Sequence, residues 1–369
     1  MPDVSSLASK VLWLAFFFSF AFGAIAQRTH FCTMGAVSDA VNMGDYTRLR
    51  QWALAAGVAM LGFWSLAAGG LVDPAKTLYS SSRWLWLSAL VGGAMFGFGM
   101  VLASGCGSKT LVRIGGGNLK SIVVFLVLAV SAFATLKGIT AVVRVATVDR
   151  AAIEFGGPAT LPHGAASLLG VTPVLAGVVL ALAVGGALVA WALTGPGFRT
   201  FENLLGGLGI GAIIAAMWWT SGHVGHVAEH PETLQEAFLA TNSGRAEALS
   251  FVAPVAYTLD WLLFFSDKSK VLTIGIVSVG GVVLGSAAVA LATHTFRWEG
   301  FRGTEDVANH LAGGALMGIG GVTAMGCTIG QGLSGLSTLS ATSGVAVAAI
   351  LAGAVAGLKY QGWRLERLA

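Results

Sequence analysis

The chain is a succession of long apolar blocks separated by shorter polar stretches. A helix needs ~20 mostly apolar residues to cross a lipid bilayer. Ten blocks approach this length, at residues 10–27, 50–72, 84–104, 119–143, 172–194, 204–220, 250–266, 271–293, 307–325 and 339–358. The first, sixth and seventh blocks are shorter than a full span, so the pattern predicts nine or ten crossings.

Composition favours a membrane protein. Of the 369 residues, 55% are hydrophobic and only 10% are charged, whereas a soluble domain carries about 25% charged residues. So few charges cannot cover a soluble protein of this size. We therefore predict an all-α polytopic membrane protein with about nine spanning helices and short re-entrant helices, which forms a single membrane domain over residues 1–369. No basic run or aromatic–basic pattern indicates a nucleic-acid partner.

Basic residues predict an orientation, because lysine and arginine accumulate in cytoplasmic loops. If every block crosses, the N-terminus lies outside and three basic clusters share the cytoplasmic side: Arg48 and Arg50, then Lys109, Arg113 and Lys120, then Lys268 and Lys270. The basic residues from Arg297 onward then fall on the opposite side. One of the later blocks is therefore expected not to cross.

An internal repeat is the most informative feature of the sequence. Residues 92–106 (GGAMFGFGMVLASGC) and 313–327 (GGALMGIGGVTAMGC) are identical at nine of fifteen positions without a gap. Chance gives roughly one or two matches in so Gly- and Ala-rich a chain, so we interpret the repeat as a duplication. We predict a first repeat half at 10–145 and a second at 172–358. In transporters built this way, the substrate site lies at the repeat interface.

Each copy of the repeat ends at Gly–Cys and then turns polar. Gly105 and Cys106 precede GSKTLVRIGGG, and Gly326 and Cys327 precede TIGQGLSGLST. These tails are too polar and glycine-rich to face lipid. They predict helices that break within the membrane, where the freed N–H groups of helix N-termini can face an anion. A third segment, QRTHFCTMG at 27–35, places Arg28, His30 and Cys32 close together in a similar setting.

The three cysteines, Cys32, Cys106 and Cys327, are too dispersed for a disulfide framework or a zinc site. An isolated cysteine in an apolar helix is usually a small hydrophobic residue. Two of these cysteines occupy equivalent repeat positions at predicted helix breaks, which favours a function. A neutral thiol is a weak donor, and a conducting site must bind an ion weakly enough to release it. The thiols are therefore suited to act as successive weak stations for an anion.

The elements QRTHFC, SGCGSK and MGCTIGQG, in this order on a Gly-rich membrane repeat, resemble the YeeE/YedE (sulfur transport) family. The resemblance covers most of the chain. It implies an hourglass-shaped helical fold and uptake of thiosulfate, or a related sulfur anion, across the bacterial inner membrane. It also implies a soluble TusA-like sulfur carrier as a cytoplasmic partner and a central station at Cys106.

The residues that we expect along the substrate pathway are those of the three motifs: Cys32, Cys106, Cys327, Gly105, Gly326, Lys109, Arg28 and Gln331. Lys109 departs from many relatives, which carry small or polar uncharged residues after the first Gly–Cys. A permease for another sulfur or selenium compound therefore stays an alternative. Arg28 and Lys109 either act on the pathway or extend to the interface.

A second class of function is a membrane-embedded thiol enzyme that transfers or reduces sulfur at Cys106. Such an enzyme is expected to have a resolving cysteine, a cofactor site or a general base, and no such group is evident in the sequence. We therefore expect no catalytic residue and no cofactor. A structural or partner-binding membrane subunit is a third and weaker alternative. His223, His226 and His230 are spaced to share one helix face; we favour an interfacial polar helix there over a metal site.

Overall fold

The computed structural model describes residues 4–368. The first part of the chain forms α1 (Val4–Thr29), α2 (Thr33–Asn42), α3 (Thr47–Ala68), η1 (Pro74–Lys76), β1 (Arg83–Trp84), α4 (Trp86–Leu102), α5 (Gly107–Gly115), α6 (Leu119–Lys137), α7 (Ile139–Ala146), η2 (Val148–Arg150) and β2 (Ile153–Glu154). The chain continues with α8 (Leu161–Leu169), α9 (Pro173–Leu180), η3 (Ala181–Gly185), α10 (Gly186–Leu193), α11 (Phe201–Leu204), η4 (Leu205–Gly209), α12 (Ile210–Trp219), η5 (Thr220–Val224), β3 (His226–Val227), β4 (Ala237–Phe238), α13 (Ala253–Leu263), α14 (Ile274–Ala292), α15 (Thr304–Thr323), η6 (Gly330–Gly335) and α16 (Ala341–Leu368).

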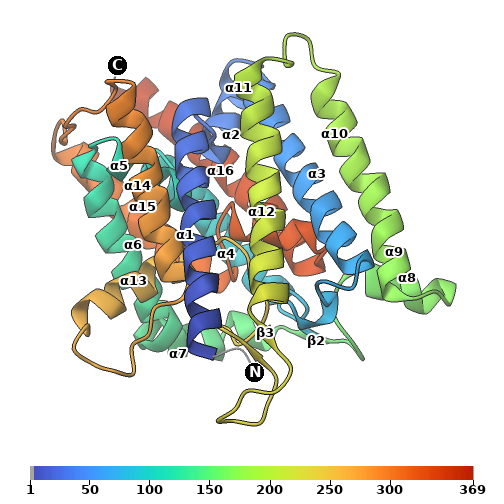
Figure 1. The fold of residues 1–369 in the computed structure, drawn as a ribbon. Helices are drawn as coiled ribbons and strands as arrows, with labels where there is room; N and C mark the ends of the chain where they lie inside the picture. Colours follow the sequence, from blue (N-terminus) through green and yellow to red (C-terminus); the bar gives the residue numbers. More distant parts are fainter. Residues whose placement is uncertain (1–3, 369) are drawn as a thin grey trace.

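The spanning helices confirm the prediction of an all-α polytopic membrane protein. Within residues 4–368, eight helical runs are long and apolar enough to cross a bilayer: Val4–Asn42, Thr47–Ala68, Trp86–Gly115, Leu119–Lys137, Pro173–Leu193, Phe201–Val224, Ile274–Ala292 and Ala341–Arg367. They stand side by side in Figure 1, with the N-terminus at one face of the bundle and the C-terminus at the other.

The predicted blocks differ from these runs in four places. The first block extends into α1, with 26 residues, and the sixth lies within a continuous run of 24 residues, so both are full spans. The seventh block shrinks to α13, whose 11 residues span about 16 Å against ~30 Å of hydrocarbon. The ninth block is α15, which begins with the polar turn Thr304–Asp306. This polar start keeps α15 out of the eight runs. The chain begins and ends on opposite faces of the bundle (Figure 1), which requires an odd number of crossings, so α15 also crosses and α13 is the block that does not.

The two faces of the bundle carry different elements. The face with the N-terminus, called the N-terminal face below, carries α7, α8, α13 and the short strands (Figure 1). The opposite C-terminal face carries α2, α11 and the C-terminus. Because α13 does not cross, it is the later block that was expected to fail. Arg297, Arg302 and the basic C-terminal residues therefore lie on the same face as Arg48. Lys268 and Lys270, which follow α13, lie on the N-terminal face instead, so their predicted side was wrong.

The two copies of the repeat pack against each other through glycine. A Cβ atom on Gly92 would lie 2.6 Å from the carbonyl oxygen of Gly320, and one on Gly320 would lie 2.6 Å from that of Gly92. Gly99 and Gly313 face each other in the same way. α4 and α15 are thus antiparallel, and their contact is reciprocal, as in an interface with two-fold symmetry. Only glycine permits this backbone approach, which substitutes for the hydrophobic force that is absent between helices in lipid.

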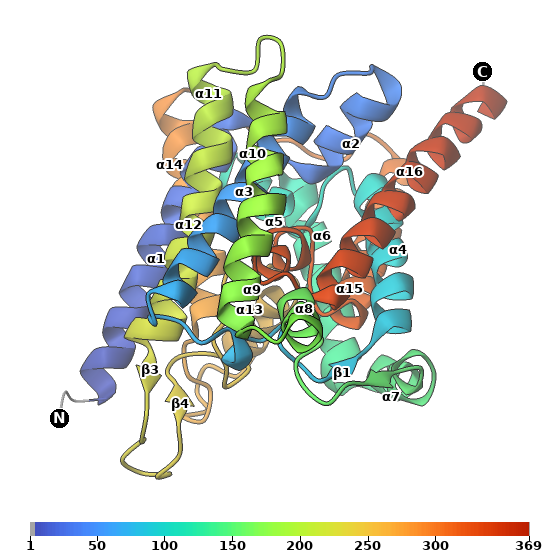
Figure 2. The same cartoon turned by 90° about the vertical axis from the view of Figure 1, so that its right-hand side faces the viewer.

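Two further glycine contacts bring helix backbones equally close together. Gly97 of α4 lies against the carbonyl of Ile350 in α16, and Figure 2 shows α16 running obliquely beside α4 toward the C-terminus. Gly285 of α14 lies against the carbonyl of Phe20 in α1. Close glycine contacts therefore join α16 to the repeat pair and, separately, α14 to α1.

The histidine segment does not form the predicted helix. The chain leaves helical geometry after Val224, and β3 pairs with β4 as an antiparallel hairpin on the N-terminal face. His223 stacks on Trp219, while His226 contacts Glu236 at 2.5 Å. Within the part of the chain that the structure describes, no group of three or more His, Cys, Asp or Glu side chains is arranged to hold a metal ion.

Candidate functional site

The three cysteines lie at three helix breaks of the same form. Two residues before each cysteine, a non-glycine residue has left-handed backbone: His30 (φ 52°), Ser104 (φ 55°) and Met325 (φ 56°). Such residues are uncommon outside glycine and cluster at functional sites, because the surrounding structure has to hold them there. Each cysteine then precedes a new helical segment. The sequence repeat includes only two of these breaks, whereas the structure contains three.

The two repeat copies also share their backbone hydrogen bonds. The N–H of Gly105 donates to Met100 at 2.8 Å, and the N–H of Gly326 donates to Gly321 at 2.8 Å, which closes the preceding helix. The next helical turn repeats as well, since Gln331 donates to the carbonyl of Cys327 at 2.8 Å and Thr110 to that of Cys106 at 2.9 Å. The division into halves at 10–145 and 172–358 stays a prediction.

Cys327 is fully buried among backbone donors. The N–H of Gly330 lies 3.4 Å from its sulfur, and the N–H groups of Phe251 and Ile329 also point to it. The segment that carries Phe251 is held in place by Ser334, whose hydroxyl donates to the carbonyl of Leu249 at 2.7 Å. Successive N–H groups of this kind form a concave site for negative charge.

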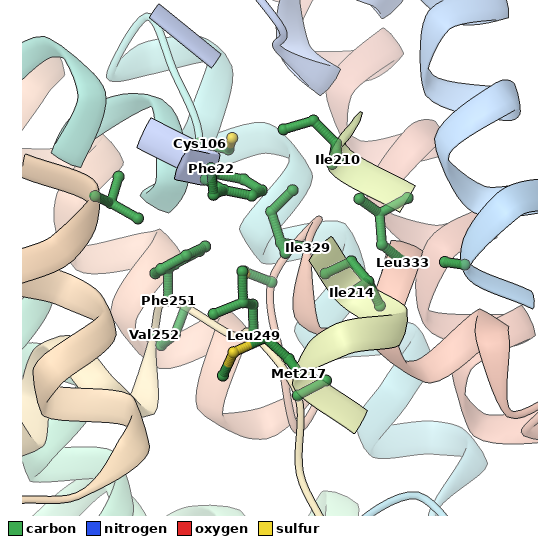
Figure 3. Packing of buried hydrophobic residues seen from close by; sticks show 14 of the residues in the cluster. Phe22, Cys106, Ile210, Ile214, Met217, Leu249, Phe251, Val252, Ile329 and Leu333 are labelled. Atoms are coloured by element: carbon green, nitrogen blue, oxygen red, sulfur yellow. The ribbon is translucent and has the colours of Figure 1, made fainter. Parts of the chain in front are cut away.

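Cys106 is the central thiol and is 1% exposed. Its sulfur lies 3.3 Å from the hydroxyl of Ser108 and beside the hydroxyl of Thr328, the residue that follows Cys327. The Thr328 Oγ1 atom makes no hydrogen bond within the described residues. Cys106 belongs to the buried apolar cluster that contains Phe22, Phe251 and Ile329 (Figure 3). Thr328 thus joins the surroundings of Cys327 to those of Cys106.

Cys32 lies beside Cys106, within reach for the two thiols to interact. It is the N-cap of α2, and its sulfur accepts from the N–H of Gly35 at 3.4 Å. Cys106 is likewise the N-cap of α5. Two helix N-termini, each the positive end of a helix dipole, therefore meet at the paired thiols.

A group of cations lies on the C-terminal side of the paired thiols. Lys109 is close enough to Cys32 and Cys106 to interact electrostatically with both, and Arg48 and Arg113 lie within electrostatic range of Lys109. Arg48 also pairs with Asp39 at 3.3 Å. From Cys327 through Thr328, Cys106 and Cys32, the site is a row of weak donors that ends at fixed positive charge.

The remaining predicted residues have more varied settings. Gly105 lies against Lys109, since a Cβ atom there would be 3.2 Å from the Lys109 Cγ atom, and a Cβ atom on Gly326 would be 3.0 Å from the Gln331 Cγ atom. Arg28 is exposed, and its guanidinium lies 6.0 Å from the ring centroid of Phe201. The structure therefore brings the cysteines, both glycines and Lys109 together, and does not bring Arg28 to them.

Gln331 is fully buried and holds the second break together. Its side-chain amide donates to the carbonyl of Ala324 at 2.6 Å, and its Oε1 atom accepts from the hydroxyl of Ser343 at 2.5 Å. Both groups are buried, so the amide joins the end of α15 to the start of α16. This geometry assigns Gln331 a positioning role beside the thiols.

Replacing Gln331 with leucine is expected to lower the free energy of unfolding by about 3 kcal/mol, because two buried polar groups lose their partner. Thermal unfolding in detergent measures the effect. Gln361→Leu is the matched control, because its side chain donates to Val101 at 3.3 Å from a partly exposed position; we expect little change there. Equal melting temperatures for the two variants would contradict the positioning role.

Several site residues were missed from the sequence. Ser108 and Thr328 carried a signal, since each is a hydroxyl residue at the start of the segment after a repeat cysteine. Phe251 contributes only its backbone N–H, which no sequence pattern reveals. The contact between Cys32 and Cys106 joins residues 74 positions apart (106 − 32) and depends on the tertiary fold.

Comparisons with known proteins give matches over most of the chain. A family model described as Sulphur transport matches residues 28–356. The chain is 28% identical over 324 residues to the thiosulfate transporter TsuA of Escherichia coli (strain K12). The aligned region covers 84% of this chain and 83% of that protein. It is 24% identical over 344 residues to the thiosulfate transporter TsuA of Spirochaeta thermophila. The aligned region covers 91% of this chain and 94% of that protein.

Proposed function

The chain belongs to the sulphur transport family, and from this premise we propose that it is a multi-pass bacterial inner-membrane transporter that takes up thiosulfate. The relatives named as thiosulfate transporters match over most of their length. The observation that carries the proposal is the row of three thiols at three helix breaks, each surrounded by N–H or hydroxyl donors. An anion can follow this row without a fixed charge at the centre of the row.

Weak donors suit the passage of a dianion. Thiosulfate carries a terminal sulfur and three oxygens, so thiols can contact its soft end while backbone N–H groups and hydroxyls contact its oxygens. A lysine or arginine at the centre of the bilayer would hold a dianion too tightly for rapid release. Here Lys109 lies at the end of the row, where it draws the anion away from Cys106.

We infer that the C-terminal face is cytoplasmic and that the N-terminus lies outside. Arg48, Arg50, Arg297, Arg302 and the basic C-terminal residues share the C-terminal face, as lysine and arginine near the cytoplasmic ends of spans do. In this orientation thiosulfate meets Cys327 first, then Cys106 and Cys32, and last the cations around Lys109.

Thiosulfate uptake needs a driving force. Each elementary charge moved against a membrane potential of about 100 mV costs about 2.3 kcal/mol, and thiosulfate carries two negative charges into a negative interior. Uptake therefore needs consumption of thiosulfate inside or an accompanying positive charge. A soluble TusA-like sulfur carrier at the cytoplasmic face would consume it, and this partner stays a prediction.

The thiol enzyme is the second candidate, and one contact favours it. Cys32 lies beside Cys106, which gives Cys106 the neighbouring thiol that a sulfur-transferring enzyme would need. We favour transport because the relatives are named transporters and each of the three thiols lies at a helix break. The chemical form of the sulfur that emerges distinguishes the two functions.

The test is uptake of sulfur-labelled thiosulfate into proteoliposomes that contain this protein alone, with protein-free liposomes as the control. We expect uptake that saturates with concentration and delivers intact thiosulfate. Sulfite or protein-bound sulfane sulfur inside the vesicles would support the enzyme instead. No uptake by the folded protein, with or without a trapped thiosulfate-consuming system, would overturn the proposal.

A further inference from the structure

A cavity of about 240 Å³ lies on the N-terminal face, away from the cation group. Its lining includes Glu247, Tyr257 and Ser278, and it extends to Met325 and Gly326, the two residues before Cys327. Asn242 and Ser243 also line it and are exposed, so the cavity is open to the solution. It therefore leads from the outer solution to the segment that carries the first thiol of the row.

Ser278 supplies a free donor to this cavity. It is 1% exposed, it belongs to the cavity lining, and its hydroxyl has no hydrogen-bond partner among residues 4–368. Buried hydroxyls are rarely left unpaired in proteins, because an unmade hydrogen bond is costly. An unpaired hydroxyl facing a solvent-connected cavity is the expected state of a ligand donor before its ligand binds.

Glu247 is the acidic residue of this cavity. Its carboxyl oxygens accept from the N–H of Asn242 at 3.3 Å and from the hydroxyl of Ser243 at 3.0 Å. Arg144, the basic residue in the cavity lining, lies 3.1 Å from Asp149 and so has its own counter-ion. A dianion cannot share this space with an ionised carboxylate unless the carboxylate first takes up a proton.

We propose that the cavity is an outer binding site for the thiosulfate dianion, in which Ser278, Tyr257 and the neutral carboxyl of Glu247 donate hydrogen bonds before the anion reaches Cys327. The proposal rests on the proposed function and adds the site at which uptake begins. A proton from the outer solution binds the carboxylate oxygen of Glu247 and forms an O–H donor. The neutral carboxyl then attracts the anion that the carboxylate repels.

The groups around Glu247 are consistent with this titration. Burial raises the pKa of Glu247 to about 7, and the hydrogen bonds from Ser243 and Asn242 act in the opposite direction, to lower it. The other ionisable groups near it are Tyr257, Tyr79 and the Arg144–Asp149 pair. Both tyrosines stay neutral because burial and nearby negative charge raise their pKa values. Glu247 is therefore the group that changes charge near neutrality.

The first test compares the outer-pH profile of thiosulfate uptake in wild type and Glu247→Gln, with inner pH fixed. Because the neutral form admits the anion, wild-type uptake is expected to fall by about tenfold between pH 6 and pH 8, as one proton with this pKa requires. Glu247→Gln is expected to take up thiosulfate at a rate independent of pH. Tyr257→Phe is expected to keep the wild-type slope with a higher KM. The same tenfold fall in Glu247→Gln would overturn the proposal.

A second test uses the serine and covers the case in which Glu247→Gln does not fold. Ser278→Ala is expected to raise the KM for thiosulfate at least about threefold with little change in kcat, since it removes one donor from a site used before translocation. Ser286→Ala is the matched control: Ser286 lies on the same helix, is fully buried, and donates to the carbonyl of Val283. An unchanged KM in Ser278→Ala would exclude the outer site. No wild-type uptake at any pH would instead refute the proposed function.

Discussion

Cys106→Ala is expected to reduce thiosulfate uptake by at least about tenfold while the protein stays folded. Cys106 is the central thiol, and its neighbours Ser108, Thr328 and Cys32 come from three different segments. A hydrogen bond to a charged group contributes ~1.5–3 kcal/mol, and each 1.4 kcal/mol corresponds to about tenfold in rate or affinity. Uptake by proteoliposomes at matched protein content measures the effect.

Met100→Leu is the control for the loss of a buried sulfur at this level. Met100 is fully buried on α4, and leucine preserves its volume, so we expect normal uptake. Cys106→Ser, which keeps a donor but not the soft sulfur, is expected to fall between wild type and Cys106→Ala. Uptake by Cys106→Ala at the wild-type rate would exclude the central thiol as a station.

Gly285→Ala is expected to cause the largest loss of stability among single methyl additions on α14. A Cβ atom at this position would lie 1.9 Å from the carbonyl oxygen of Phe20 and 2.7 Å from its carbon, so α1 and α14 would have to separate. Overpacking of this kind costs about 3 kcal/mol. Thermal unfolding of the purified protein and the yield of monodisperse protein measure the loss.

Gly280→Ala on the same helix is the matched control. A Cβ atom at Gly280 meets no other atom within 4 Å, and alanine is a better helix former than glycine by roughly 1 kcal/mol. We expect this variant to be as stable as wild type or slightly more stable. If both alanine variants melt at the wild-type temperature, the close contact of α1 with α14 does not limit stability.

The membrane class, the repeat and the helix breaks were predictable because they depend on short-range pattern. A run of apolar residues has to be a helix in lipid, and Gly–Cys followed by polar residues cannot continue one there. Residue spacing was a less reliable predictor of structure at the ends of helices. The histidine spacing indicated a helix over 223–230, but the chain leaves helical geometry after Val224, and Glu236 of the hairpin contacts His226 instead.

The site itself was predictable only as a set of separate motifs. Two contacts depend on how α1, α4 and α15 pack. Cys32 contacts Cys106, and Thr328, which follows Cys327, contacts Cys106. Gln331 illustrates the same limit. Its sequence position was correctly associated with the second break, but its bonds to Ala324 and Ser343 assign it a supporting role that no local pattern reveals.

The reciprocal contact between α4 and α15 bears on how a protein of this kind arises. Because Gly92 meets Gly320 while Gly99 meets Gly313, each surface is complementary to an inverted copy of itself. Two half-length chains inserted in opposite directions could make this contact before any fusion joined them. Fusion then fixes one copy in each direction, and the two helices become free to diverge. The second copy carries Thr328 and Gln331 where the first has Gly107 and Thr110, so the two breaks share their backbone hydrogen bonds but differ in their side chains.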